Sequence, residues 1–305
     1  MCKAFVRLVC SIFYFTVLID SSGTVYNKKC SRLTREQMLN LMRRQDVSFR
    51  YLPVVLWEKK ILYCLIPKTG STSFLGLMRK IAGKRDWREN PHFLQTKNAT
   101  HVNDRFHWYG LDQLQHFSKA EICEIMLSPE WKRIVVVRDP ARRLLSAWQN
   151  KIRDGGYSEP NLDRLVSIFG VADRQALKEL TFEAFVNFLY NNRDRSIIFD
   201  VHWLPQVEFC GLKRFGKAYQ YQIRTEEMSK DTRHFLEDAG LWDSFGKNYT
   251  GDGRAVFEEN LTPFSHNYSD HIFAKYFNQQ LLEKVLNIYH HDYELLNYEP
   301  QFHLV

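Results

Sequence analysis

The chain has 305 residues, of which 45% are hydrophobic and 14% aromatic, so it can bury a sizeable core, which argues against a disordered protein or a linker array. No Pro/Gly/Ser-rich linker, run of like charge or internal repeat divides it, which predicts one domain from about Phe49 onward. The formal net charge of +7 predicts a surface that attracts anions, such as nucleic acid, acidic polysaccharide, anionic lipid or a phosphate-bearing cofactor. Because the sequence has neither an RNA-binding aromatic motif nor a zinc-finger spacing, nucleic acid is disfavoured.

The N-terminus has the order of charged and apolar residues that is typical of export signals. Lys3 and Arg7 precede an apolar run over residues 8–19, and polar and small residues follow at 20–23. We expect residues 1–23 to be a cleaved signal peptide or a short signal anchor, with a buried N-terminal helix as the alternative. Residues 24–48 are then a short stem before a globular domain at 49–305.

Sequons and cysteines favour the same export route. Four N-x-S/T sequons are present, at Asn98, Asn248, Asn260 and Asn267. The six cysteines include no CxxC pair, which argues against a metal cluster. In an oxidising lumen disulfides can form among the last four, although the sequence does not assign the pairs: Cys30, Cys64, Cys123 and Cys210.

The first chemically informative unit is an apolar run of strand length at 61–66, followed by a small, hydroxyl-rich loop and an apolar helical stripe. Free backbone N–H groups at a helix N-terminus attract phosphate or sulfate, and a glycine lets the backbone approach the anion closely. The residues expected to bind the anion are Pro67, Lys68, Thr69, Gly70, Ser71, Thr72 and Ser73. An ordinary Ser/Thr-rich helix cap is the alternative. Lys68 precedes the only glycine, so the loop is not a Walker motif, which disfavours an ATPase or kinase.

A second unit of the same kind follows a β-branched run at 133–137. Arg138 stands at the expected strand end, and Arg143, Ser146 and Asn150 align on one face of the next helix. Converging guanidinium and hydroxyl groups suit a nucleotide 3′-phosphate, with a solvated polar face as the alternative. Two strand–turn–helix units predict an α/β fold with a parallel sheet.

The later part of the chain reads mostly as core-facing helices. One apolar stripe runs through 182–189 and another through 277–289, whereas Asp243–Pro263 is rich in Gly, Asn and charge and is predicted to be a loop region.

Together, the two loops resemble the 5′-phosphosulfate and 3′-phosphate loops of sulfotransferases that use PAPS (3′-phosphoadenosine 5′-phosphosulfate). The resemblance spans roughly Leu62 to Tyr298 and extends to landmarks of the Golgi carbohydrate sulfotransferases of the chondroitin 4-O/HNK-1 type: Thr100-His-Val102, Phe182–Val186, Asp200–Cys210 and Tyr289–Tyr298. The pattern R-[DE]-P-x-x-R-L-x-S matches from Arg138 to Ser146, whereas the loop at 67–73 is closer to the P-K-T-A-S-T-S of heparan and uronyl 2-O-sulfotransferases.

The resemblance implies a single-domain, P-loop-like sulfotransferase fold with a central parallel sheet flanked by helices. It implies PAPS as sulfate donor, no metal, an anionic glycan such as chondroitin as acceptor, and a type II protein of the Golgi lumen, with secretion after cleavage as the alternative. A heparan or uronyl 2-O-sulfotransferase is the enzymatic alternative. A non-catalytic glycan-binding protein is an alternative of another class, which the retained Lys68, Arg138 and Ser146 argue against.

Sulfuryl transfer needs charge neutralisation on the leaving group and a base for the acceptor hydroxyl. Lys68 is expected to do the first. For the base, His101 is the first candidate because its His-Val position resembles the catalytic region of the 2-O enzymes; His202 is the second and His107 the third. His290 and His291 are predicted to be surface or cap residues, and Lys151 and Arg153 could steer an anionic glycan, with plain surface charge as the alternative.

Overall fold

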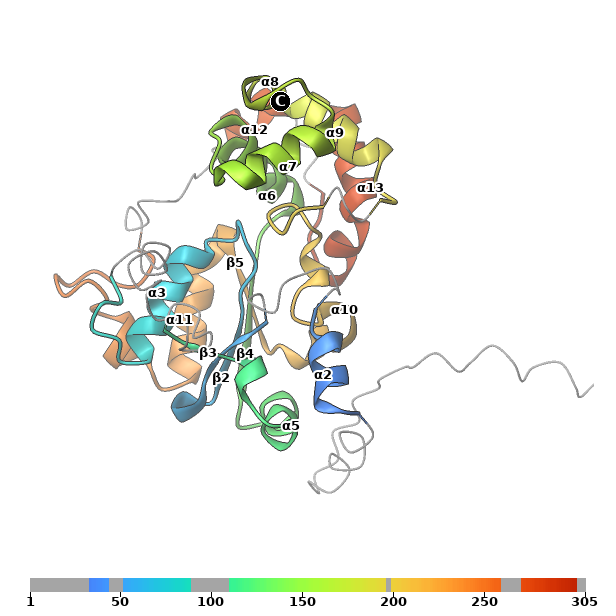
Figure 1. Cartoon of the computed structure of the whole chain (residues 1–305). Helices are drawn as coiled ribbons and strands as arrows, with labels where there is room; N and C mark the ends of the chain where they lie inside the picture. Colours follow the sequence, from blue (N-terminus) through green and yellow to red (C-terminus); the bar gives the residue numbers. More distant parts are fainter. Residues whose placement is uncertain (1–32, 44–51, 89–109, 196–198, 259–269, 301–305) are drawn as a thin grey trace, which may run out of the picture.

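The computed structural model describes residues 33–43, 52–88, 110–195, 199–258 and 270–300. Its centre is a five-stranded sheet in the order β3-β1-β2-β4-β5 (Figure 1). The strands have these bounds: β1 Val54–Leu56, β2 Ile61–Cys64, β3 Asp112–Gln113, β4 Lys132–Val137 and β5 Tyr221–Arg224.

The predicted parallel sheet is confirmed for its central part. Strands β2, β4 and β5 are parallel, whereas β1 runs antiparallel to both β2 and β3. The antiparallel edge follows from the connection, because β1 and β2 are joined only by a 3₁₀ turn at Trp57–Lys59, and a short turn can join only antiparallel strands. All residues of β2 and nearly all of β4 are buried, as expected for parallel strands covered on both faces.

Helices cover both sides of this sheet. Figure 1 shows α3 and α11 on one side and α2 and α10 on the other. Together with the sheet they enclose the larger apolar core, which includes Tyr63, Phe74 and Phe235. The helices around the sheet have these bounds: α2 Arg35–Leu41, α3 Ser71–Ile81, α5 Lys119–Leu127, α10 Leu212–Phe215 and α11 Met228–Asp238.

A second apolar cluster is built mainly from helices and includes no strand residue. It contains the two predicted stripes, whose members are all buried, including Phe185, Val285 and Tyr289. Figure 1 shows these helices gathered beyond one end of the sheet. Their bounds are α6 Pro140–Ala147, α7 Glu159–Phe169, α8 Arg174–Lys178, α9 Phe182–Asn191, α12 Asp270–Tyr276 and α13 Gln279–Leu295. In the predicted loop region, Trp242–Gly246 forms a π-helical turn, and residues 259–263 lie outside the described part.

Helix α6 continues into a π-helical turn at Trp148–Arg153. Such turns widen a helix locally and often occur at functional sites. The turn closes on Gly156, whose N–H donates to the Asn150 carbonyl at 2.9 Å. A Cβ on Gly156 would lie 2.4 Å from that carbonyl oxygen, so only glycine fits the observed backbone.

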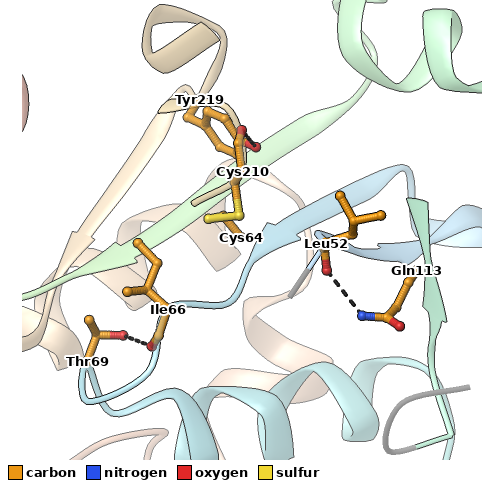
Figure 2. Close-up of a disulfide and its surroundings, with 7 residues drawn as sticks. All are labelled: Leu52, Cys64, Ile66, Thr69, Gln113, Cys210 and Tyr219. Carbon is orange, nitrogen blue, oxygen red and sulfur yellow. Dashed lines mark hydrogen bonds between the residues drawn. A yellow bond between two sulfur atoms is a disulfide. The ribbon is translucent and has the colours of Figure 1, made fainter. Parts of the chain in front are cut away.

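A disulfide joins Cys64, the last residue of β2, to Cys210 (Figure 2). Both cysteines are fully buried, and the Tyr219 hydroxyl donates to the Cys210 carbonyl at 2.9 Å. The sequence predicted disulfides among four cysteines without assigning pairs, and the structure assigns this one.

The predicted export features fall largely outside the described residues. Residues 1–32 and the sequons at Asn98, Asn260 and Asn267 lie there, whereas Asn248 is described and exposed. Within the described ranges, no helix combines the length and the apolar character needed to cross a membrane.

Candidate active site

The β2–α3 loop, residues 65–70, has the shape of an anion-binding turn. Lys68 and Gly70 adopt left-handed backbone conformations, with φ of 71° and 77°. The Thr69 hydroxyl donates to the Ile66 carbonyl at 2.9 Å (Figure 2), and the Thr225 hydroxyl donates to the Thr69 carbonyl at the same distance. The N-cap residue of α3 is Gly70, which makes no side-chain cap bond, and a helix N-terminus is where backbone N–H groups bind anions.

The fit around Gly70 is tight. A Cβ at this position would lie 2.8 Å from the terminal methyl carbon of Met228, at the start of α11. The three residues that follow, Ser71, Thr72 and Ser73, are partly exposed in the first turn of α3. The residues predicted to bind the anion are therefore contiguous around one helix N-terminus, and their contact with a donor stays a prediction.

Lys68 reaches from this loop to the π-helical turn, where its Nζ donates to the Asn150 Oδ1 atom at 3.0 Å. Its pKa is lowered to about 7, first because the ammonium group is buried and then because Lys151, Arg138 and Arg143 are nearby cations. A multiply charged anion would relieve the repulsion among these cations, so the cluster favours the binding of such an anion.

Arg138 enters this cluster from the next strand. It follows β4 directly, is 9% exposed, and its Nη1 lies 3.4 Å from the Lys68 carbonyl oxygen. Asp139 then caps α6 by accepting the Arg142 N–H at 2.8 Å, and Pro140 occupies the first turn. Burial, helped by the negative charge of Glu226, raises the pKa of Asp139 to about 6.

Arg143 is buried in the interior, with 1% exposed. Its guanidinium donates to the carbonyl oxygens of Pro67 at 2.8 Å, Leu204 at 2.7 Å and Val201 at 3.2 Å. The alternative of a solvated face is therefore wrong for Arg143, and also for Ser146, which is 3% exposed. These contacts show that Arg143 joins the β2–α3 loop to residues 201–204. Its binding of a 3′-phosphate stays a prediction, as does that of Ser146.

His202 belongs to a hydrogen-bonded group with Asp200 and Tyr157. Its Nδ1 lies 2.5 Å from Asp200 Oδ1 and 2.8 Å from the Tyr157 hydroxyl, which also donates to Asp200. Burial lowers the pKa of His202 to about 4, opposed by Asp200 and assisted by the charges of Lys151 and Lys68. Burial alone would raise the pKa of Asp200, but hydrogen bonds from His202 and Tyr157 outweigh it and lower the pKa to about 2.

This arrangement can accept a proton. With Nδ1 held by Asp200, the Nε2 atom is left for an acceptor hydroxyl, and the imidazole is neutral at pH 7. Lys68, Arg138 and His202 come from three separate segments of the chain, which the fold brings together. The sequence had predicted a role for each of them independently. Tyr157 gave no sequence signal, whereas the Asp-Val-His spacing of Asp200 and His202 could have suggested the pair.

The remaining predicted residues are placed as follows. His101 and His107 lie outside the described residues, so their roles stay predictions. His290 and His291 are exposed on α13, which confirms their interpretation as surface residues. The Lys151 ammonium donates to the Gly156 carbonyl at 2.7 Å and lies 4.6 Å from the centre of the Tyr157 ring. Across the described ranges, no group of three or more His, Cys, Asp or Glu side chains is arranged to hold a metal ion.

Comparisons with known proteins identify the family that this chain resembles. A model of the sulfotransferase family matches residues 54–299. Carbohydrate sulfotransferase 10 from Homo sapiens is 27% identical over 194 residues, which are 60% of this chain and 51% of that protein. The same enzyme from Xenopus laevis is 25% identical over 240 residues, 74% of this chain and 63% of that protein. Carbohydrate sulfotransferase 8 from Mus musculus is 23% identical over 269 residues, which are 85% of this chain and 60% of that protein.

The chain thus spans between about half and two thirds of the length of these relatives. No solved structure matches it. The family match covers both strand–loop–helix units, the segment with His202 and all of α13. The resemblance predicted from the sequence is confirmed at the level of the family: this chain belongs to the sulfotransferase family.

Proposed function

We propose that this protein transfers a sulfuryl group from PAPS to a hydroxyl group of a carbohydrate. The observation that carries the proposal is the partly buried ammonium of Lys68, which donates to Asn150 and is set among Arg138, Arg143 and Lys151 within electrostatic reach of the imidazole of His202. An anion site beside a base is what transfer of a charged group to a hydroxyl requires. The names of the relatives, carbohydrate sulfotransferases 10 and 8, support the acceptor class.

PAPS supplies the sulfuryl group and departs as the 3′,5′-bisphosphate. In this proposal the N–H groups at the start of α3 and the Lys68 ammonium bind the 5′-phosphosulfate end and neutralise the charge that develops on the leaving oxygen. Arg138 binds the 3′-phosphate from the neighbouring strand, and Ser146 and Arg143 complete or support that contact. Asn150 holds the Lys68 ammonium against the π-helical turn until an anion takes its place.

His202 is the base favoured by the geometry. Its Nε2 would accept the proton of the attacking hydroxyl while Asp200 stabilises the imidazolium through Nδ1. A pKa of about 4 makes the imidazole a weak base. Because the charges of Lys151 and Lys68 contribute to that low value, an anionic donor that neutralises them would raise it. His101 remains the alternative base.

The proposed compartment is the lumen of the secretory pathway, with residues 1–23 as signal peptide or type II anchor. The buried Cys64–Cys210 disulfide supports an oxidising compartment, and the exposed Asn248 sequon is placed where glycosylation could occur. The proposed acceptor is a glycosaminoglycan such as chondroitin, with heparan or uronic acid 2-O positions as the alternative. Lys151, which faces the Tyr157 ring beside His202, supports an anionic acceptor.

The experiment that tests the proposal is transfer of labelled sulfate from PAPS by the full chain. The acceptors are chondroitin, desulfated dermatan, desulfated heparan and a neutral glycoprotein. Transfer to one polysaccharide, with the position read by disaccharide analysis, would establish the activity and name the acceptor. Transfer to none of them without binding of the bisphosphate product would contradict the proposal.

A further inference from the structure

We propose that Gln206 and Asp292 are positioning residues that hold the backbone of Arg138 in register for donor binding. The inference rests on the proposed function, because it assumes that Arg138 contacts the donor. Neither residue belongs to the two phosphate loops, and neither was singled out as a site residue by the sequence.

Gln206 binds both backbone groups of Arg138. Its Oε1 accepts the Arg138 N–H at 3.0 Å, and its Nε2 donates to the Arg138 carbonyl at 2.8 Å. The last register pair between β4 and β5 is Val137 with Arg224, so Arg138 is the first residue beyond that pairing. The amide side chain of Gln206 thus supplies the two hydrogen bonds that a neighbouring strand would otherwise make.

Asp292 fixes Gln206 in turn. It lies on α13, is fully buried, and accepts the backbone N–H of Gln206 at 2.8 Å through one oxygen and that of Val207 at 2.9 Å through the other. Using both carboxylate oxygens on adjacent backbone N–H groups fixes the direction of the chain at Gln206. The side chain of Gln206 is likewise fully buried, so water cannot replace these bonds.

The contacts of Gln206 and Asp292 therefore connect helix α13 to the end of β4. If the carboxylate of Asp292 had only a structural role, its bonds would have no particular relation to the donor site. Gln206 instead bonds the backbone of Arg138, whose side chain joins the cation cluster around Lys68, and Asp292 acts on Arg138 only through its bonds to the backbone at Gln206 and Val207. Small displacements of a binding group that is held this way weaken its contact with the ligand.

The test is a double-mutant cycle on affinity for the bisphosphate product, measured by calorimetry with the full chain. Gln206→Met has a similar shape and removes both bonds to Arg138, and we expect it to weaken binding about tenfold. Arg138→Ala should weaken binding at least as much. If Gln206 acts through Arg138, the double variant binds no more weakly than Arg138→Ala, whereas independent losses that multiply would overturn the proposal.

A matched control separates positioning from general stability. Tyr219 is also buried, and its hydroxyl donates to the Cys210 carbonyl at 2.9 Å. Tyr219→Phe should lower the melting temperature but leave bisphosphate affinity unchanged. In steady state, Gln206→Met should raise KM for PAPS about tenfold and change kcat by less than about twofold. A loss confined to kcat would contradict the proposal.

Asp292→Asn provides a second test of the positioning role if Gln206→Met fails to fold. Asp292→Asn keeps the shape but can accept only one of the two backbone N–H groups, and it should show the same loss of affinity and the same non-additivity with Arg138→Ala. Wild-type protein that binds no bisphosphate would refute the proposed function itself. Wild-type binding that both Gln206→Met and Asp292→Asn leave unchanged would refute only the positioning role.

Discussion

Removal of the Cys64–Cys210 disulfide should cost this protein a large part of its stability. The two cysteines are 146 residues apart, so the bond closes a loop of nearly half the chain. In the chain-entropy model, a cross-link over this separation lowers the entropy of the unfolded state by an amount equivalent to about 5 kcal/mol at 25 °C. Losses measured for native disulfides are about 2–5 kcal/mol, so we expect Cys64→Ala/Cys210→Ala to fall near the upper end of that range.

The assay is denaturant unfolding without reductant, with the free energy of unfolding and the slope m compared between wild type and double variant. Because the bond acts mainly on the unfolded chain, m should rise as the unfolded state expands. Wild type unfolded in the presence of reductant is the control and should lose at least as much stability as the variant, because reductant also breaks the disulfide of Cys123. A loss below about 1 kcal/mol, with m unchanged, would refute the reasoning from loop closure.

Three further predictions concern the site. Asp200→Asn should lower kcat by about 100-fold and leave bisphosphate affinity unchanged, because it removes the charge that stabilises the His202 imidazolium. Single-turnover transfer measures this loss, and an unchanged kcat would exclude His202 with Asp200 as the base. Gly156→Ala should destabilise the protein by more than Gly83→Ala, because a Cβ at Gly156 would lie 2.4 Å from the backbone carbonyl oxygen of Asn150, whereas one at Gly83 would meet no atom within 4 Å. Equal losses in melting temperature would contradict this packing. Because the pKa of Lys68 is lowered to about 7, bisphosphate binding should weaken as pH rises from 7 to 9, and binding at pH 8 should take up a proton. Calorimetry in buffers of different ionisation enthalpy measures this uptake, and Lys68→Met should abolish it.

The elements that the sequence predicted well are those determined by local patterns. The strand–loop–helix units around Lys68 and Arg138 carry their apolar periodicity and turn residues within a few positions of one another, and the structure confirms both. By contrast, β1 has only three residues and β3 only two, too few to establish a period, so the antiparallel edge could not be predicted.

The parts of the site that were missed depend on distant contacts. The burial of Arg143 was not predicted, because its carbonyl partners are 76, 61 and 58 residues away in the chain, where no local sequence pattern indicates them. Tyr157 approaches His202 across 45 residues, and Asp292 approaches Gln206 across 86. The choice of Cys210 as the partner of Cys64 is of the same kind, because four cysteines allow several pairings.

The proposed function depends above all on Lys68, which binds the 5′-phosphosulfate end of PAPS and neutralises the charge on the leaving oxygen. The direct test is single-turnover transfer of labelled sulfate to the acceptor that the transfer experiment above selects. Lys68→Ala is compared with Lys247→Ala, which replaces an exposed lysine far from the loop in sequence. The account predicts that Lys68→Ala loses transfer by at least about 100-fold whereas Lys247→Ala matches wild type. Transfer by Lys68→Ala at the wild-type rate would contradict it.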